Sequence, residues 1–356
     1  MIVVAKVGTS SITGADGSLR PAAMAKVADE IVELRAAGHE VVLVSSGAIA
    51  AGLPELGMSA LDRPRDPSVL QAVSAVGQTL LVGAFREAFA GRAVVGQVLL
   101  SPLDFMVREQ YLHARETLAT LGELGVVPVI NENDAVADDE IRFGDNDRIA
   151  ALVAQLVGAD VLVLLTDAAG VFTADPRRDE TASLIEEILE VDQVLEAAAG
   201  GAGSTRGSGG MATKLAAAKL AAWSGVRTVI AAADRPNVLP EAVAGAAGVG
   251  TTVQPGPARL SARKVWIAFG VASAGRLVVD AGARRALEER GASLLAAGVR
   301  DVVGSFEAEA SVEVADEAGE VFAKGLVRLG SAAIDAGRGE SGLIVIHRDD
   351  LVVNLP

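Results

Sequence analysis

The first 250 residues alternate short apolar runs with longer segments of helical pattern. The apolar runs, rich in Val, Ile and Leu, predict strands at 2–7, 40–44, 94–100, 126–130, 161–165 and 228–231. Because these runs lack an apolar–polar alternation, each strand is expected to be covered on both faces. The pattern therefore predicts an α/β fold with a mostly parallel central sheet sandwiched by helices.

Polar or glycine-bearing turns follow four of the predicted strands. They read GTSS at 8–11, SSGA at 45–48, NEND at 131–134 and TDAAG at 166–170. Ligands of parallel sheets bind beyond the carboxyl ends of the strands, so these turns are expected to converge on one cleft.

The longest stretch without a charged residue, 67–85, has the length of a membrane span. Within it, Gln71, Ser74 and Gln78 recur at helical spacing and form a polar stripe. The stripe favours a buried helix that lines a polar site, and no membrane association is expected.

The pattern changes after residue 250. Segment 251–263 contains two prolines and a glycine, which predicts a domain boundary between a first domain at 1–255 and a second at 263–356. Short β-type segments and one helical segment then predict a small β-rich, barrel-like domain, with these elements at 277–279, 282–290, 310–314, 325–328 and 343–346.

Composition and charge narrow the class of protein. Hydrophobic residues make up 51% of the 356 residues, enough for two cores, and the net charge of −15 disfavours binding to nucleic-acid backbones. The absence of cysteine excludes disulfides and thiolate chemistry, and the three histidines lack metal-ligand spacing. The N-terminus shows no signal peptide, which predicts a cytoplasmic location.

A glycine cluster with a lysine, GSGGMATK at 207–214, precedes an alanine-rich helical segment. Glycines let backbone N–H groups approach an anion, a helix start adds its dipole, and Lys214 adds a full charge. Lys6, at the end of the first predicted strand, offers a second cation at the same sheet edge. Two lysines beside a polyphosphate suit phosphoryl transfer, although no Walker A sequence is present.

Two polar clusters, NEND at 131–134 and GDND at 144–147, lie about ten residues apart. Their carboxylates and amides can hold an ammonium group or ligate Mg²⁺, and the alternative is ordinary turn and helix-cap chemistry. Ser46 and its neighbours can dock a substrate carboxylate. Thr166 and Asp167 can contact a nucleotide or cap the following turn.

These motifs together resemble the amino-acid kinase family and, within it, the glutamate 5-kinase branch. The resemblance covers nearly the whole chain, because the part ending in VIHRDDLVV at 345–353 resembles a PUA domain. Its anchors are KVGTSS at 6–11, VSSGAIAAG at 44–52, AVGQ at 75–78, PVINENDAVA at 128–137, FGDND at 143–147, LLTDAAGVFTADPR at 164–177 and GGMATK at 209–214.

The resemblance implies phosphorylation of the side-chain carboxylate of L-glutamate by ATP with Mg²⁺, giving L-glutamyl 5-phosphate, the first step of proline biosynthesis. By the same resemblance Lys6 and Lys214 are catalytic, and Asp147 acts through Mg²⁺ or by orienting Lys6. The positions that match ATP-binding residues are Lys6, Thr166, Asp167, Ser208, Gly209, Gly210, Met211, Ala212, Thr213 and Lys214. Those that match glutamate-binding residues are Ser46, Asp134 and Asn146.

Other readings stay open at this point. Aspartate, acetylglutamate and UMP kinases share the fold, and Arg142 and Arg148 flank GDND, where a phosphate-bearing acceptor needs additional cations. RNA binding is a second class, since PUA domains occur in RNA-modifying enzymes, but the acidic charge and the lack of a basic cluster after residue 261 disfavour it. The resemblance further implies a homo-oligomer, feedback inhibition by proline and contact with glutamyl phosphate reductase, and it identifies no metal ligand.

Overall fold

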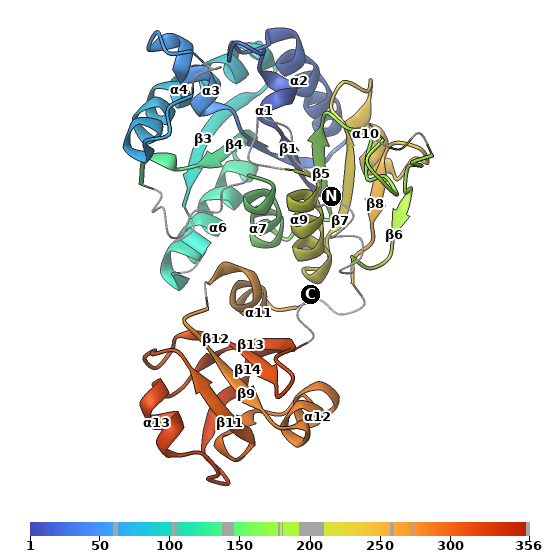
Figure 1. Ribbon diagram of the computed structural model, residues 1–356. Coiled ribbons are helices and arrows are strands. Elements are labelled where there is room, and N and C mark those ends of the chain that lie inside the picture. Colours follow the sequence, from blue (N-terminus) through green and yellow to red (C-terminus); the bar gives the residue numbers. More distant parts are fainter. Residues whose placement is uncertain are drawn as a thin grey trace. The chain divides into compact units, whose positions relative to one another are not determined.

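The computed structural model, shown in Figure 1, describes residues 1–59, 63–101, 104–105, 107–136, 146–176, 179, 181–191, 210–256, 260–271 and 273–353. The chain forms two compact units, Met1–Arg259 and Leu260–Pro356. Each unit has its own sheet and its own apolar core, and each is described separately.

The first unit contains an eight-stranded sheet in the order β3-β4-β2-β1-β5-β7-β8-β6. Its strands are β1 Ile2–Val7, β2 Glu40–Ser45, β3 Val94–Leu100, β4 Val126–Glu132, β5 Val161–Thr166, β6 Glu187–Ile188, β7 Arg227–Ala232 and β8 Thr251–Val253. The first six in this order pair in parallel, whereas β8 runs antiparallel to β7. The four strands that carry the polar turns, β4, β2, β1 and β5, are therefore immediate neighbours whose carboxyl ends share one edge, as predicted.

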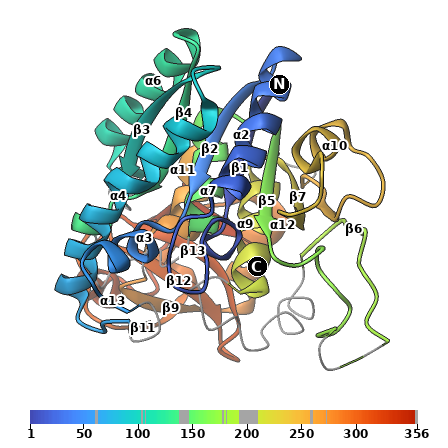
Figure 2. The ribbon, with the colours of Figure 1, turned by 90° about the horizontal axis from the view of Figure 1, so that it is seen from above.

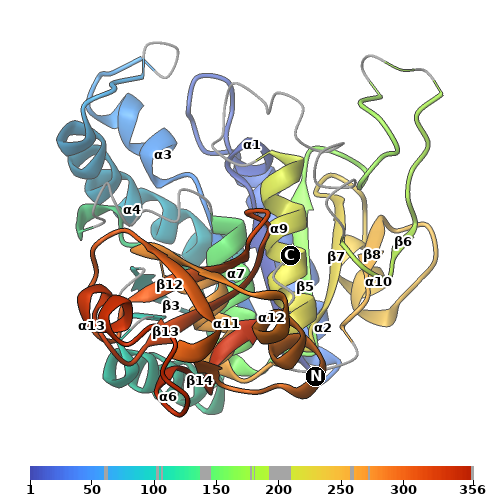
Figure 3. The ribbon, with the colours of Figure 1, turned by 60° about the horizontal axis from the view of Figure 1, so that its bottom comes forward.

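Helices cover both faces of this sheet. On one face lie α2 (Pro21–Ala36), α4 (Pro67–Phe89) and α10 (Val238–Ala244), and on the other lie α6 (Arg108–Glu123), α7 (Asn146–Val157) and α9 (Met211–Trp223) (Figure 1). Local sequence sets where helices begin: Pro67 occupies the first turn of α4, and the Asp66 carboxylate accepts a hydrogen bond from the Ser68 N–H at 2.9 Å. Figure 3 shows α7 and α9 side by side.

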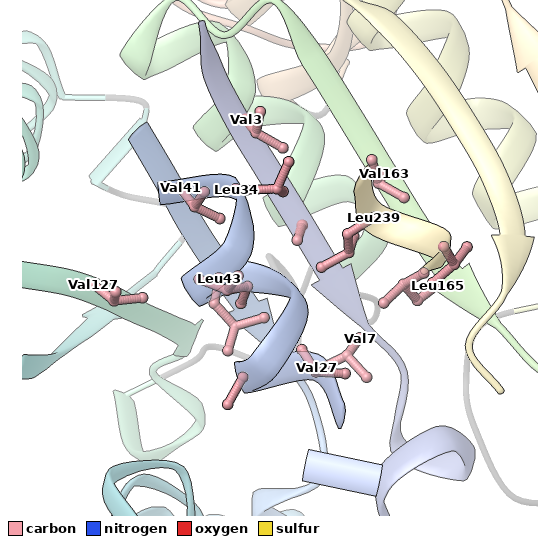
Figure 4. Close-up of a cluster of buried hydrophobic side chains, with 14 of the residues drawn as sticks. Val3, Val7, Val27, Leu34, Val41, Leu43, Val127, Val163, Leu165 and Leu239 are labelled. Carbon is pink, nitrogen blue, oxygen red and sulfur yellow. The ribbon is translucent and has the colours of Figure 1, made fainter. Parts of the chain in front are cut away.

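The alternation of side chains along β1 determines where its one lysine points. Val3 and Val7 pack with Val163 of β5 and Leu239 of α10 in the apolar core on the α2 face, which Figure 4 shows. Because neighbouring residues of a strand point to opposite faces, Lys6 points to the face that carries α7 and α9.

A short helix, α3 (Ala48–Glu55), starts directly after the turn at the end of β2 and packs closely on α4, beside which it lies in Figure 2. Both helices have a glycine at the contact. A Cβ atom on Gly77 would lie 1.7 Å from the carbonyl oxygen of Ala48, and one on Gly52 would lie 2.2 Å from that of Val73. The two backbones therefore touch in a way that any larger residue prevents, and this contact positions α4 relative to the end of β2.

The second unit contains a six-stranded sheet in the order β10-β14-β13-β12-β9-β11. Its elements are α11 Ala262–Val265, the π-helix η2 Trp266–Gly270, β9 Gly275–Val279, α12 Ala281–Arg290, β10 Leu294–Leu295, the 3₁₀ helix η3 Ala296–Gly298, β11 Val299–Val303, β12 Ser311–Asp316, β13 Val321–Val327, α13 Ser331–Ala336 and β14 Ile344–Val353. Leu277, Leu287 and Ile334 belong to the apolar core that joins this sheet to α12 and α13. The predicted β-rich C-terminal fold is confirmed.

The strands predicted for the first unit are confirmed, with bounds that agree within two residues. The predictions missed β6 and β8, which are only two and three residues long. β8 occupies the start of segment 251–263, which had predicted the domain boundary, and it pairs with β7, so the sheet of the first unit extends to Val253. In the second unit β11 was missed because Arg300 and Asp301 interrupt its apolar pattern.

Among the described residues, α4 is long and apolar enough to cross a membrane by length and composition. Its contacts identify it instead as a core helix of the first unit. It packs on α2 and α3, and Leu81, Phe85 and Phe89 are buried in the core against the sheet. Its polar residues Ser74 and Gln78 are buried as well, at the carboxyl edge of the sheet.

Candidate active site

Two lysines and an aspartate that are distant in sequence meet at the carboxyl edge of the first sheet. Lys6 Nζ lies 2.5 Å from Asp147 Oδ1, and Lys214 Nζ lies 2.9 Å from Asp147 Oδ2. Lys6 comes from β1, Asp147 from the first turn of α7 and Lys214 from the first turn of α9. All three side chains are at least nine-tenths buried. The structure therefore brings together the three residues predicted to be catalytic.

The charges in this cluster do not cancel. Burial alone would raise the pKa of the Asp147 carboxyl, but the nearby charges of Lys6 and Lys214 and their hydrogen bonds outweigh it and lower the pKa to about 2. Asp147 is therefore ionised at neutral pH. One carboxylate between two lysines leaves a surplus of positive charge, and a buried surplus of this kind favours the binding of an anion.

The start of α9 adds backbone donors beside Lys214. Gly210 is the N-cap residue and has no side chain to satisfy the N–H groups of the first turn, which belongs to Met211, Ala212 and Thr213. The Thr213 hydroxyl donates to the Gly210 carbonyl at 2.8 Å. These N–H groups and the helix dipole suit a phosphate group. Ser208 and Gly209, predicted to belong to the same ATP-binding segment, lie outside the described residues.

A second group of polar side chains lies beside the lysine cluster. Asn146 Nδ2 donates to Ser46 Oγ and to Asn131 Oδ1, both at 2.9 Å. Ser46 follows β2, Asn131 is in β4, and Asn146 begins α7 directly before Asp147. The first turn of α7 therefore joins the lysine cluster to a network of neutral polar groups. Gly144 and Asp145 of the GDND motif lie outside the described residues.

Helix α4 supplies two polar residues to this network that had been given no site role from the sequence. Ser74 Oγ donates to Asp134 Oδ2 at 2.6 Å. Gln78 Nε2 donates to the backbone carbonyl of Glu132 at 3.3 Å, and Gln78 Oε1 accepts from Asn131 Nδ2 at 3.2 Å. Asp134 itself begins a short 3₁₀ helix, η1 (Asp134–Val136), after β4. The predicted polar stripe on 67–85 was the signal for these residues, and the expectation that it lines a polar site is confirmed.

Thr166 ends β5 and Asp167 follows it at the same edge of the sheet, where Leu165 pairs with Val7 of β1. Thr166 is buried, and its hydroxyl donates to Asp167 Oδ1 at 3.1 Å. The turn behind them is held by β8, because Thr251 Oγ1 accepts from the Val171 N–H at 2.8 Å. The pair therefore stands on a fixed turn beside β1, although no hydrogen bond joins it to the lysine cluster among the described residues.

No group of three or more His, Cys, Asp or Glu residues that could hold a metal ion occurs in the part of the chain that the structure describes. Asp147, the carboxylate nearest the surplus charge, is engaged by both lysines.

Comparison with known proteins identifies the family and the fold. The model of the amino acid kinase family matches residues 1–232, and that of the PUA domain matches residues 275–347. Among solved structures, carbamate kinase from Giardia lamblia bound to AMP-PNP covers 71% of this chain and 98% of its own, with a TM-score of 0.52 and 19% identity. The isopentenyl phosphate kinase of T. acidophilum, with a TM-score of 0.50, 20% identity and coverage of 71% and 100%, likewise shows the fold alone. The chain therefore belongs to the amino acid kinase family.

Relatives of higher sequence identity identify the branch of the amino acid kinase family to which the chain belongs. The glutamate 5-kinase of Azoarcus sp. (strain BH72) is 50% identical over 331 residues, which cover 93% of this chain and 88% of the relative. That of Vibrio vulnificus (strain YJ016) is 44% identical over 364 residues, covering 99% and 95%. Within the amino acid kinases, the chain belongs to the glutamate 5-kinase family.

Proposed function

We propose that the protein transfers the γ-phosphoryl group of ATP to the side-chain carboxylate of L-glutamate, giving L-glutamyl 5-phosphate and ADP, the first step of proline biosynthesis. The observation that carries the proposal is the first turn of α7. There Asp147 engages the two buried lysines while its neighbour Asn146 engages Ser46 and Asn131. An anion-binding half and a polar half of one site thus meet at adjacent residues.

The anion-binding half is assigned to ATP. Lys6 and Lys214 neutralise the transferring phosphoryl group, and the N–H groups at the start of α9, from Gly210 to Thr213, bind phosphate oxygens. Thr166 and Asp167 contact the nucleotide from the end of β5. Ser208 and Gly209 belong to the same proposed segment on the basis of the family resemblance.

The polar half is assigned to L-glutamate. Ser46 and Asn146 have neutral polar groups for the α-substituents, and Asp134 has a carboxylate for the ammonium group. Ser74 holds one oxygen of this carboxylate in place at 2.6 Å. Contact with the ammonium distinguishes an amino acid from a plain dicarboxylate of the same length.

The mechanism follows from charge. The side-chain carboxylate of glutamate is ionised at neutral pH, so it attacks the γ-phosphorus without a general base. A bond forms between the carboxylate oxygen and phosphorus, the bond from phosphorus to the bridging β,γ-oxygen breaks, and ADP leaves with that electron pair. The protein brings two anions together, which the surplus charge of Lys6 and Lys214 permits, and Asp147 keeps both ammonium groups in position.

Mg²⁺ belongs to the proposal as the partner of the ATP phosphates, where it would neutralise charge and shape the polyphosphate. We expect this cation to arrive with the nucleotide, bound by the phosphate oxygens. Asp147 contributes by holding the two lysines in position.

A coupled assay tests the proposal. Formation of ADP is followed with L-glutamate, L-aspartate, N-acetyl-L-glutamate and UMP as acceptors, and L-glutamate is expected to give the highest kcat/KM. A higher kcat/KM with any of the other three would refute the glutamate assignment. A gel-shift assay at low salt tests the RNA-binding alternative, for which no shift is expected.

Three further expectations accompany the proposal. Proline retains an α-carboxylate and a cationic nitrogen but has no side-chain carboxylate, so it would occupy the positions of Ser46 and Asp134 and inhibit in competition with glutamate. A homo-oligomer is expected from the family resemblance. Transient contact with glutamyl phosphate reductase and a cytoplasmic location are expected on the same ground.

A further inference from the structure

Side-chain amides from three elements form a continuous chain of hydrogen bonds between α4 and α7. Gln78 Oε1 accepts from Asn131 Nδ2 at 3.2 Å, and Asn131 Oδ1 accepts from Asn146 Nδ2 at 2.9 Å. The backbone of Glu132 contacts this chain twice: its carbonyl accepts from Gln78 Nε2 at 3.3 Å, and its N–H donates to Asn131 Oδ1 at 2.9 Å. At the far end, Asn146 Nδ2 also donates to Ser46 Oγ.

The two backbone contacts fix which way each amide is turned. A backbone carbonyl only accepts, so the atom of Gln78 beside it must be the NH₂ group, and the Gln78 oxygen then faces Asn131. A backbone N–H only donates, so the atom of Asn131 beside it must be the oxygen. The two contacts are consistent with one set of amide orientations, in which the Asn131 oxygen faces Asn146. Asn146 must therefore turn its NH₂ group toward Asn131. Turning any one amide over would set two donors or two acceptors against each other.

The consequence appears at Asn146. Its Oδ1 atom is buried and accepts no hydrogen bond from any residue that the structure describes. Since its NH₂ group is used by Ser46 and Asn131, the atom that Asn146 has for a ligand is an acceptor. The Ser46 hydroxyl, which accepts from Asn146, keeps its hydrogen to donate.

We propose that Gln78, acting through Asn131, is a positioning residue that makes the acceptor site select for a free ammonium group. The inference rests on the proposed function, and it names the feature of the substrate that the network recognises. At neutral pH the ammonium is the one hydrogen-bond donor of L-glutamate, so it alone can satisfy Asn146 Oδ1. A carboxylate substrate without it leaves this buried acceptor without a donor, and sites built to bond a donor reject analogues that lack it by large factors.

Ser74 contributes to the same selection for an ammonium group. It holds Asp134 Oδ2 from the turn of α4 that precedes Gln78, so one helix positions both the carboxylate and the amide chain. Gly77, which lies between Ser74 and Gln78 in sequence, contacts the backbone of Ala48. This contact fixes the position of both residues relative to Ser46.

The test compares L-glutamate with glutarate, which has the same chain length and both carboxylates but no ammonium group. With the full-length protein, kcat/KM is expected to favour glutamate by at least a thousandfold. In Gln78→Met, which keeps the length but removes both hydrogen bonds, this ratio is expected to fall at least tenfold, through a raised KM for glutamate, while the KM for ATP changes less than twofold. Gln78→Glu keeps the acceptor toward Asn131 but sets a second acceptor against the Glu132 carbonyl, so it is expected to restore only part of the ratio.

Thr79→Ala is the matched control, because Thr79 is the next residue of α4 and is exposed. It is expected to leave the ratio unchanged. A purely structural role of Gln78 would lower kcat/KM for both acceptors by the same factor, and that result would overturn the inference, as would an unmodified protein that uses glutarate as well as glutamate. If Gln78→Met does not fold, Gln78→Asn, which withdraws the amide by one methylene, is held to the same expectation. A protein that phosphorylates neither acceptor would instead refute the proposed function.

Discussion

Replacing Asp147 by asparagine tests the central feature of the site, the single carboxylate between two buried lysines. The substitution preserves shape and removes the charge. Lys6 and Lys214, which are 3% and 6% exposed, would then face each other without an anion between them. We expect the variant to lose at least a hundredfold in kcat, since both cations lose their common support.

The loss of stability can be worked out from the structure. The pKa of Asp147 is about 2 against an unperturbed 3.8, a difference that corresponds to about 2 kcal/mol of folding free energy at neutral pH. Because the pKa is lowered on folding, this stabilisation is present above pH 3.8 and is lost as the pH falls toward 2. In Asp147→Asn the two buried ammonium groups are no longer neutralised, which raises the expected loss of folding free energy to about 3–5 kcal/mol. Such a change lowers Tm by roughly 5–15 °C.

The assay is thermal unfolding of the full-length protein, with and without a non-hydrolysable ATP analogue. The analogue is expected to raise Tm more in Asp147→Asn than in the unmodified protein, because its phosphates replace the missing negative charge between the lysines. Asp29→Asn is the matched control. The Asp29 carboxylate also bonds a cation, Arg92 at 2.6 Å, but is 60% exposed, so its removal is expected to cost less than about 1 kcal/mol.

Two results would refute this reasoning. If Asp147→Asn unfolds at the same temperature as the unmodified protein at pH 7, the lysines do not depend on the carboxylate for their burial. If the two proteins still differ by the full amount near pH 2, where about half of the unmodified carboxylate is protonated and most of its stabilisation is lost, the difference does not arise from its charge.

Further substitutions test other parts of the site and fold. Lys214→Met is expected to lower kcat about a hundredfold or more by removing a cation from the transferring phosphoryl group, and a near-normal kcat in steady-state assays would contradict its role. Asp134→Asn is expected to raise the KM for glutamate far more than that for ATP; the reverse would place Asp134 in the nucleotide site. Gly77→Ala is expected to destabilise the protein by about 1–3 kcal/mol in urea unfolding. Gly83→Ala on the same helix, where a Cβ meets nothing within 4 Å, is expected to stabilise it by up to about 1 kcal/mol. Equal effects of the two substitutions would rule out the backbone contact. A fragment of residues 1–260 is expected to fold and phosphorylate glutamate, because every residue assigned to the site precedes 215; a folded but inactive fragment would show that the second unit completes the site.

The parts of the fold that follow from local pattern could be predicted from the sequence. Uninterrupted apolar runs mark the central strands because both faces of those strands are buried, and the turns after them are polar because they end at a solvated edge. Short edge strands leave little such signal. β8 is three residues long and lies next to two prolines, so its local sequence resembles a linker, and only its pairing with β7 makes it a strand.

The candidate site was predictable in its charged residues and less so in its neutral ones. Lys214 stands out because it follows a glycine cluster at the start of a helix, and Lys6, an ordinary lysine at a strand end by itself, becomes significant because it lies at the same sheet edge. The partners of Ser74 and Gln78 were not predictable, because they depend on the order of the strands and on the distance between α3 and α4. The polar stripe showed that α4 meets something polar, but only the folded chain shows that it meets Asp134 and Asn131.

Helix α4 also has a consequence for the synthesis of the protein. Its 23 residues are as apolar as a membrane span, and the turn at 131–134 that covers their polar stripe is made only after some forty further residues. Until then the growing chain carries a long apolar segment whose contacts with β4 and η1 cannot yet form, and chains in this state are prone to aggregate. Substitutions that weaken the contacts of α4 with α3 or with η1 should therefore lower the yield of soluble protein in a cell more than they lower the kcat of the protein that does fold.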